Sequence, residues 1–198
     1  MRIAALALLI CALFAPRHAR AQEPPTEREY AVWSALIDTA LVTPRVKRVI
    51  VEVETVPGDR RRAGGPFEQR SFTRQRDHSP LPAELLQAFA RANAAPSRLN
   101  PAHFRARVHV QALGDAGRQK APAPDDHEAW SEMQDGGFPG SSGIVTLSRV
   151  GFTGDGRTAL VFVSHYCGGL CAAETYYVLV LGPDNRWRVT HDYTTSVS

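Results

Sequence analysis

Long apolar runs are scarce in this sequence, and the one that stands out lies at the N-terminus, from Ile3 to Ala15. Its length of about 13 residues is too short to cross a bilayer core, which needs roughly 20. The run follows Arg2 and precedes the small-x-small triplet Ala19-Arg20-Ala21, a pattern typical of a secretory signal peptide. We therefore expect residues 1–21 to be removed between Ala21 and Gln22, which would leave a periplasmic or secreted protein without a transmembrane segment.

Cysteine is equally scarce, with three residues in the chain, and Cys11 belongs to the predicted signal peptide. The exported chain keeps one pair, Cys167 and Cys171, which excludes the multiple-disulfide framework of small secreted scaffolds. Residues 22–198 are numerous enough to bury about 70% of their extended-chain surface around one core. We therefore predict a single domain over residues 22–198, with a Gly/Pro/Ala-rich internal linker at residues 114–124.

The exported chain has no excess of either charge. Three of the 23 basic residues leave with the signal peptide, so 20 basic residues face 20 acidic ones. This balance removes the main electrostatic argument for a nucleic-acid partner, and none is expected. The charge is unevenly divided, because residues 22–120 carry 16 basic and 11 acidic groups whereas residues 121–198 carry 4 and 9.

The clearest structural pattern is a series of strand sequences from Gly140 to Tyr193, connected by the short sequences TGDGR, CGGLC and GPDN. Its middle segment, Thr158 to Tyr166, is apolar at both alternate sets of positions, as expected of a strand covered on both faces. We therefore predict a four-strand meander over residues 140–193, with residues 158–166 at the centre of the sheet.

A helix is predicted upstream, from about Glu27 to Leu41. Thr26 and Glu29 form a capping-box pattern at its start. An apolar stripe at spacings of three or four then follows, made of Tyr30, Trp33, Ile37 and Leu41. We interpret this stripe as the face that packs on the sheet.

Three further elements are predicted before the meander. Residues 46–56 alternate apolar and polar side chains as a half-exposed strand does, and residues 104–112 read as a one-sided strand with a cationic outer face. A second helix starts at Ser79 and buries a stripe made of Leu85, Leu86, Phe89 and Ala92. The predicted fold is therefore α+β: N-terminal helices packed on a curved, mostly antiparallel sheet of about six strands that ends in the meander.

An arginine-rich loop follows the first predicted strand. Its Gly-Gly-Pro sequence indicates a loop, and its six arginines are Arg60, Arg61, Arg62, Arg70, Arg74 and Arg76. These side chains could bind an anionic partner, or they could simply be solvated. His103 and His109 are interpreted as solvated histidines on the outer face of the strand predicted at 104–112.

The most unusual residues of the chain, His165, Cys167 and Cys171, lie at the end of the predicted central strand. An exported Cys-x3-Cys pair across a tight glycine turn favours a structural disulfide between Cys167 and Cys171. Two alternatives stay open: a redox-active dithiol, and zinc or copper held by His165 and the two thiolates. The spacing differs from Cys-x2-Cys, and a second ligand pair is missing, so no metal or cofactor is expected.

A hydrolytic site is the other alternative. His165 or His191 could serve as a general base, with Glu174 nearby to orient an imidazole if the sheet brings them together. Asp192 adjoins His191 and therefore points to the opposite face of the strand. The candidate functional cluster is thus His165, Cys167, Cys171, Glu174 and His191.

The order SRVGF, ALVFVSHYCGGLC, YYVLVL and RWRV resembles a group of exported bacterial proteins that carry the same series. The opening EREYAVWSALI is similar to their first helix, and the turn GPDNRW and the terminus TSVS depart from their pattern. The resemblance implies a shared fold and export, and it brings no catalytic residues. The function expected from the sequence is a non-enzymatic envelope or secreted module that binds a protein or another envelope macromolecule.

Overall fold

The computed structural model describes residues 23–56, 81–113, 128, 140–141, 143–166 and 172–197. The helices are α1 (Glu27–Leu36) and α2 (Ala83–Ala92). The strands are β1 (Arg48–Glu52), β2 (His109–Leu113), β3 (Ile144–Leu147), β4 (Gly151–Phe152), β5 (Thr158–Tyr166), β6 (Ala172–Leu181) and β7 (Trp187–Val197). The predicted signal peptide, the arginine-rich loop, the linker 114–124 and all three cysteines lie outside the described residues.

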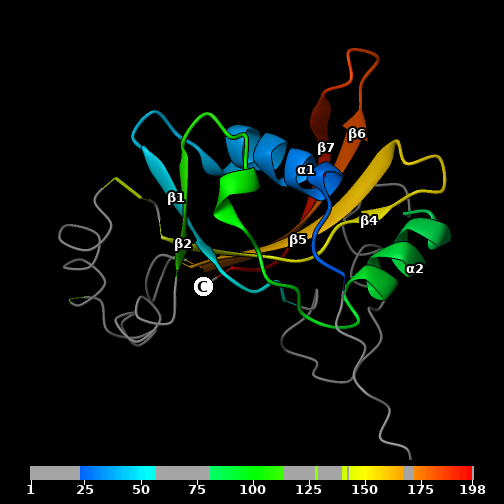
Figure 1. The fold of residues 1–198 in the computed structure, drawn as a ribbon, viewed down its shortest axis with the longest axis horizontal. Helices are drawn as coiled ribbons and strands as arrows, with labels where there is room; N and C mark the ends of the chain where they lie inside the picture. The colour runs from blue at the N-terminus through cyan, green and yellow to red at the C-terminus, as the bar shows by residue number, and fades with distance from the viewer. Residues whose placement is uncertain are drawn as a thin grey trace, which may run out of the picture.

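The strands form an open mixed sheet in the order β2-β1-β3-β5-β6-β7, with β4 also paired to β5 (Figure 1). β1 runs parallel to β2 and to β3, and the other pairs are antiparallel. This arrangement confirms the predicted α+β class and the mostly antiparallel sheet. The sheet has seven strands, where about six were predicted, because the first strand of the meander is divided into β3 and β4.

Strand β5 is buried on both faces, as its sequence predicts. Ala159, Val161 and Val163 belong to the core that contains α1. Leu160 and Phe162 belong to a second core that contains α2. The two helices therefore cover opposite faces of the sheet, with β5 between them.

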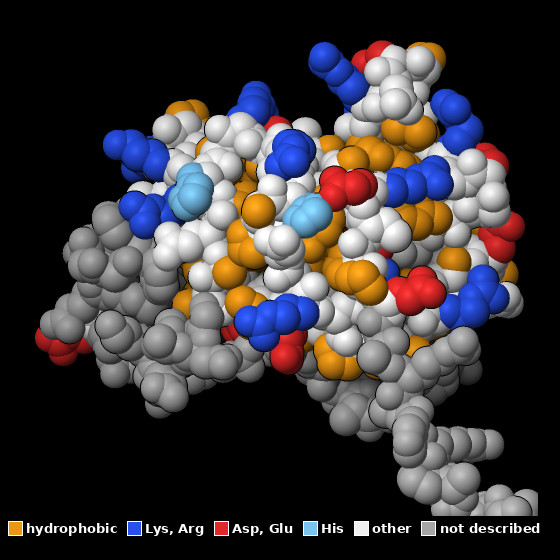
Figure 2. Space-filling view, in the orientation of Figure 1, with side chains coloured by type: hydrophobic (Ala, Val, Ile, Leu, Met, Phe, Trp, Pro, Cys, Tyr) orange, Lys and Arg blue, Asp and Glu red, His pale blue; other side chains and the backbone are white. Residues whose placement is uncertain are grey.

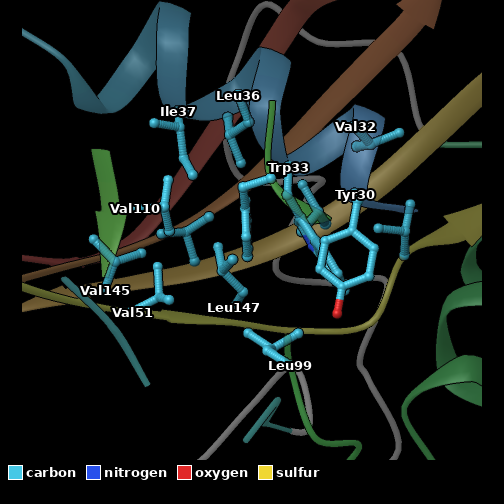
Figure 3. Packing of buried hydrophobic residues seen from close by; sticks show 14 of the residues in the cluster. Tyr30, Val32, Trp33, Leu36, Ile37, Val51, Leu99, Val110, Val145 and Leu147 are labelled. Carbon is cyan, nitrogen blue, oxygen red and sulfur yellow. The ribbon is translucent and has the colours of Figure 1, made fainter. Parts of the chain in front are cut away.

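Helix α1 begins at the predicted capping box, because Thr26 Oγ1 accepts from Glu29 N at 3.3 Å and Glu29 Oε2 accepts from Thr26 N at 2.8 Å. Tyr30 and Trp33 of the predicted stripe are buried in the core (Figure 3). The helix continues as a π-helical turn over Ile37–Leu41. The predicted helix from Glu27 to Leu41 is confirmed, with a wider final turn.

Strand β1 differs from the half-exposed strand predicted at residues 46–56. Its three central residues, Val49, Ile50 and Val51, are all buried. Val49 and Val51 pack into the α1 core, and Ile50 packs with Leu113 and Ile144 in a separate cluster, so both sets of alternate positions are buried. The charged side chains of Arg48 and Glu52 lie at the two ends of the strand, where they are only half-buried.

The strand predicted at residues 104–112 is shorter in the structure and begins at His109. Upstream, Pro101–His103 forms a 3-10 turn, and the next residues run along α1 with their backbone amides bonded to helix side chains. The apolar alternation was read correctly, because Phe104 is buried in the α1 core and Ala106 and Val108 pack against it. The assignment of residues 104–108 to a strand was wrong, because the amides of Arg105 and Arg107 bond to Ser34 and Asp38 and not to a neighbouring strand.

Helix α2 begins at Ala83, after Pro82 at its N-cap, rather than at the predicted Ser79. It lies so close to the sheet that a Cβ built on Gly151 would come within 2.5 Å of the backbone of Phe89. Glycine at position 151 is therefore required for this helix to reach β4. Among the described residues, no helix is both long and apolar enough to span a bilayer.

The segment between β3 and β4 joins α1 to the sheet. Ser148 Oγ accepts from Phe162 N at 2.8 Å, and Ser148 O accepts from Trp33 Nε1 at 3.1 Å. The next residue, Arg149, is buried and paired with buried Glu29 of α1. Polar groups left by the break in the strand are thus satisfied, and α1 is fixed in position over the sheet.

Candidate functional site

A groove of about 640 Å³ runs along the outer face of α1. Its floor is formed by residues of α1 and the π-helical turn: Glu27, Ala31, Ser34, Ala35, Asp38 and Thr39. One wall is the segment 103–107, and the other is the tip of the β6–β7 hairpin at residues 185–187. Figure 2 shows basic side chains both on this hairpin and over α1, with hydrophobic surface exposed between them.

The first wall is bonded to α1 through its backbone. Asn100 N donates to the Tyr30 hydroxyl at 2.7 Å, and Arg105 N donates to Ser34 Oγ at 2.8 Å. Arg107 N then donates to Asp38 Oδ1 at 2.7 Å. Because residues 30, 34 and 38 are one helical turn apart, they form a ladder of acceptors along α1. This ladder holds an extended segment without a neighbouring strand.

The second wall is a tight turn braced by an ion pair. Asn185 takes a left-handed backbone conformation with φ of 59°, and Arg188 donates to both carboxylate oxygens of Asp184 at 2.8 and 2.5 Å. These hydrogen bonds hold the pKa of Asp184 below its ordinary value. At the base of the wall, the Trp187 ring lies 5.9 Å from that of Phe152 and 5.8 Å from the guanidinium of Arg28. The hairpin tip is therefore packed against α1.

The charges of the groove are partly paired. Glu27 Oε1 contacts His103 Nδ1, and Asp38 Oδ2 lies 3.5 Å from Arg107 Nε. Arg105 donates from Nη1 to the carbonyls of Ala102 and Phe104. No carboxylate among the described residues pairs with Arg105 or with Arg186. Within the described residues, the groove thus carries two guanidinium groups whose charge no carboxylate neutralises.

The register of the sheet separates the two histidines of the predicted cluster. His165 lies opposite Ala173 and continues the β5 positions that face the α1 core. His191 lies opposite Val178, which belongs to the α2 core. Their partners on β6 are five positions apart, or about 17 Å at roughly 3.4 Å per residue. The structure therefore does not bring the two imidazoles into one site.

The other members of the cluster are only partly placed. Glu174 lies opposite Ser164 and shares the alternate positions of β6 with Val178, and hence the face of His191. Cys167 and Cys171 lie outside the described residues, as do the six arginines of the predicted anion-binding loop. The disulfide and the loop's role stay predictions. Within the part of the chain that is described, no group of three or more His, Cys, Asp or Glu side chains is arranged to hold a metal ion.

Sequence reasoning missed the groove and assigned His103 to solvent. In the structure the His103 ring stacks on Tyr30 with ring centroids 5.0 Å apart, while its Nδ1 contacts Glu27. His109, by contrast, is exposed at the start of β2, as predicted. The available clue was the polar side of the first helix, where Ala31 and Ala35 lie between charged residues. Nothing in that spacing specified the two walls.

Comparisons of the chain with protein-family models, with curated proteins and with solved structures found no match. The resemblance to exported bacterial proteins with the SRVGF and CGGLC series therefore stays a prediction. The functional proposal consequently depends on the geometry of the groove.

Proposed function

We propose that the protein is an exported, non-enzymatic module that binds a protein or another envelope macromolecule in the α1 groove. The observation that carries the proposal is a concave surface of about 640 Å³ over a helix face, bounded by two anchored walls. Ligand sites in proteins are concave surfaces of roughly this size, on the order of 300–1,000 Å³. Export itself is inferred from the N-terminal sequence.

The attachment of both walls supports binding as the role of the groove. The wall at residues 103–107 bonds to Ser34 and Asp38, and the hairpin tip packs through Trp187. A ligand that enters a surface already held in shape loses less binding free energy to ordering that surface. The acceptors of these bonds, Ser34 and Asp38, are buried and half-buried, respectively.

Site-specific photo-crosslinking tests the proposal. A benzoylphenylalanine residue at exposed position 39, on the π-helical turn that lines the groove, places the crosslinker beside the ligand, and the same residue at exposed position 84 of α2 serves as the control. We expect a discrete adduct in producing cells with the probe at 39 and none with the probe at 84. Adding Ala35→Trp, which fills the groove, should remove the adduct.

Two results would contradict a binding role for the groove. One is the same set of adducts from both positions, which indicates collision rather than binding. The other is an adduct at position 39 that persists after Ala35→Trp. Circular dichroism of each variant checks that the fold is retained.

One observation favours hydrolysis as a second candidate function. His103 lines the groove with its Nδ1 against the carboxylate of Glu27, and a carboxylate that orients an imidazole is a common general-base arrangement. The lining hydroxyl on α1, that of Ser34, already accepts from Arg105 N, so water is the nucleophile in this hypothesis. Turnover of ester or peptide substrates that is lost in His103→Gln would support it. Equal turnover by both proteins would exclude His103 as the base.

A further inference from the structure

The floor of the groove lets a ligand approach the helix closely. Ala31 and Ala35 are one helical turn apart and line it with methyl groups only. Trp187 adds apolar surface at the hairpin side. Small side chains at this spacing leave room for aliphatic groups of a ligand. Burial of these aliphatic groups in the groove would favour binding.

The charges of the groove favour a ligand that carries carboxylates. Arg105 and Arg186 come from opposite walls, and no carboxylate of the described residues neutralises either one. A guanidinium offers five N–H donors in a planar fork that matches a carboxylate. A ligand that crosses the groove between the walls can therefore be held by charge-assisted hydrogen bonds at both sides.

The same lining disfavours a dense polyanion. Glu27 and Asp38 lie on the floor beneath the two walls, so phosphates spaced regularly along a backbone would meet these carboxylates as well as the arginines. Protein grooves that bind single-stranded nucleic acid, in contrast, are positively charged along the whole path of the phosphate backbone. The alternation of positive, apolar and negative surface fits a chain whose charges are separated by neutral residues.

We infer that the groove binds a peptide segment in which carboxylate side chains alternate with aliphatic ones, with Arg105 and Arg186 as the residues that select it. This inference rests on the proposed function, because it names the ligand class of the same groove. Arg107 contributes less to selection, since its guanidinium already faces Asp38.

Fluorescence anisotropy with the purified exported protein tests the inference. The probe is a labelled peptide of sequence Glu-Val-Ala-Glu-Val-Ala-Glu, compared with its all-Gln counterpart and with a thymidine oligonucleotide of equal length. The variants are Arg105→Gln and Arg186→Gln, with Arg91→Gln at the exposed end of α2 as the matched control. We expect each groove variant to weaken the Glu peptide about tenfold, as loss of a charged hydrogen bond does. Arg91→Gln should leave its Kd unchanged.

Each other outcome is decisive. Equal binding of the Glu and Gln peptides, failure of the Glu peptide to bind, or tighter binding of the oligonucleotide would overturn the inference. Ala31→Trp separates the two proposals. If wild type binds the Glu and Gln peptides equally and Ala31→Trp abolishes the binding of both, the groove is a binding site and only the ligand class is wrong. If the Glu peptide still binds Ala31→Trp unchanged, the groove itself is not the site.

Discussion

Arg149 and Glu29, 120 positions apart in sequence, form a buried ion pair with two parallel hydrogen bonds. Arg149 Nε donates to Glu29 Oε1 at 2.6 Å, and Nη2 donates to Oε2 at 2.8 Å. Nη1 donates to Ser97 Oγ at 2.7 Å and to the carbonyl of Glu23 at 2.8 Å. Four donors of one guanidinium thus connect α1, the segment after α2 and the break between β3 and β4.

Removal of Arg149 should destabilise the protein strongly. In Arg149→Met the carboxylate of Glu29 stays buried without its cation, and such a loss costs about 3–5 kcal/mol of unfolding free energy. Urea unfolding at pH 7 measures the change. The control is Arg188→Met, which breaks an exposed ion pair with Asp184 and should have a far smaller effect. Equal losses in the two variants would mean that the buried pair does not stabilise the fold.

Gly151→Ala should also be destabilising. The new Cβ would meet the backbone of Phe89 at 2.5 Å, so α2 must move, and overpacking of this kind costs about 1–3 kcal/mol. At Gly154 a Cβ meets nothing within 4 Å, so Gly154→Ala is the matched control and should change stability little. Thermal unfolding compares the two. A midpoint for Gly151→Ala that equals that of Gly154→Ala would show that α2 does not rest on this glycine.

The sequence predicted the C-terminal sheet better than the first half of the chain. In β5 both sets of alternate positions are apolar, and that pattern predicts that both faces of the strand are covered. In β1 the polar positions Glu52 and Glu54 suggested an exposed face, and the sequence does not show that Ile50 packs with Leu113 and Ile144 of the neighbouring strands. The segment SRVGF, which contains Arg149, drew attention because it resembles part of a series in exported bacterial proteins. The ion pair between Arg149 and Glu29, however, depends on a long-range contact that local spacing does not encode.

The groove was unpredictable for a related reason. Its acceptors, Ser34 and Asp38, are ordinary polar residues of a helix surface, and their role depends on an extended segment that lies some 70 residues away. The predicted cluster around His165 failed to converge with His191 because register decides the face and the distance, and the hydrophobic pattern of β7 does not reveal its bulges. The capping box of α1 and the turns at residues 153–156 and 182–185 are local features, and they were predicted.

Ser34→Ala should loosen the first wall of the groove. The change leaves Arg105 N without its acceptor, which costs about 1–3 kcal/mol where the amide is shielded from water. Hydrogen exchange should show faster exchange of the Arg105 amide. Thr39→Ala is the control, because Thr39 Oγ1 donates to Ala35 O at 2.7 Å within the helix and does not bond to the wall. Unchanged protection at Arg105 in Ser34→Ala would contradict the ladder of acceptors.

Tyrosine burial should make the protein sensitive to alkali. Burial raises the pKa of Tyr193, and it also raises the pKa of Tyr177, where the charge of Asp192 adds to the effect. A raised folded-state pKa means stability that is complete below the unfolded pKa of about 10 and is lost as pH rises through the folded value. Wild type should therefore lose more unfolding free energy between pH 9 and pH 11 than Tyr193→Phe does. Parallel pH profiles of the two proteins would contradict this contribution of Tyr193.

The location of binding can be measured most directly by NMR titration of the ¹⁵N-labelled exported protein with the Glu-Val-Ala-Glu-Val-Ala-Glu peptide. If the α1 groove is the binding surface, the largest amide shifts should fall on Ala31, Ala35, Arg105 and Arg186, from the floor and both walls. Amides of α2, on the opposite face of the sheet, should stay in place. Shifts concentrated on α2 or on the outer edge of β2, with the groove amides unmoved, would contradict the proposed binding role of the groove.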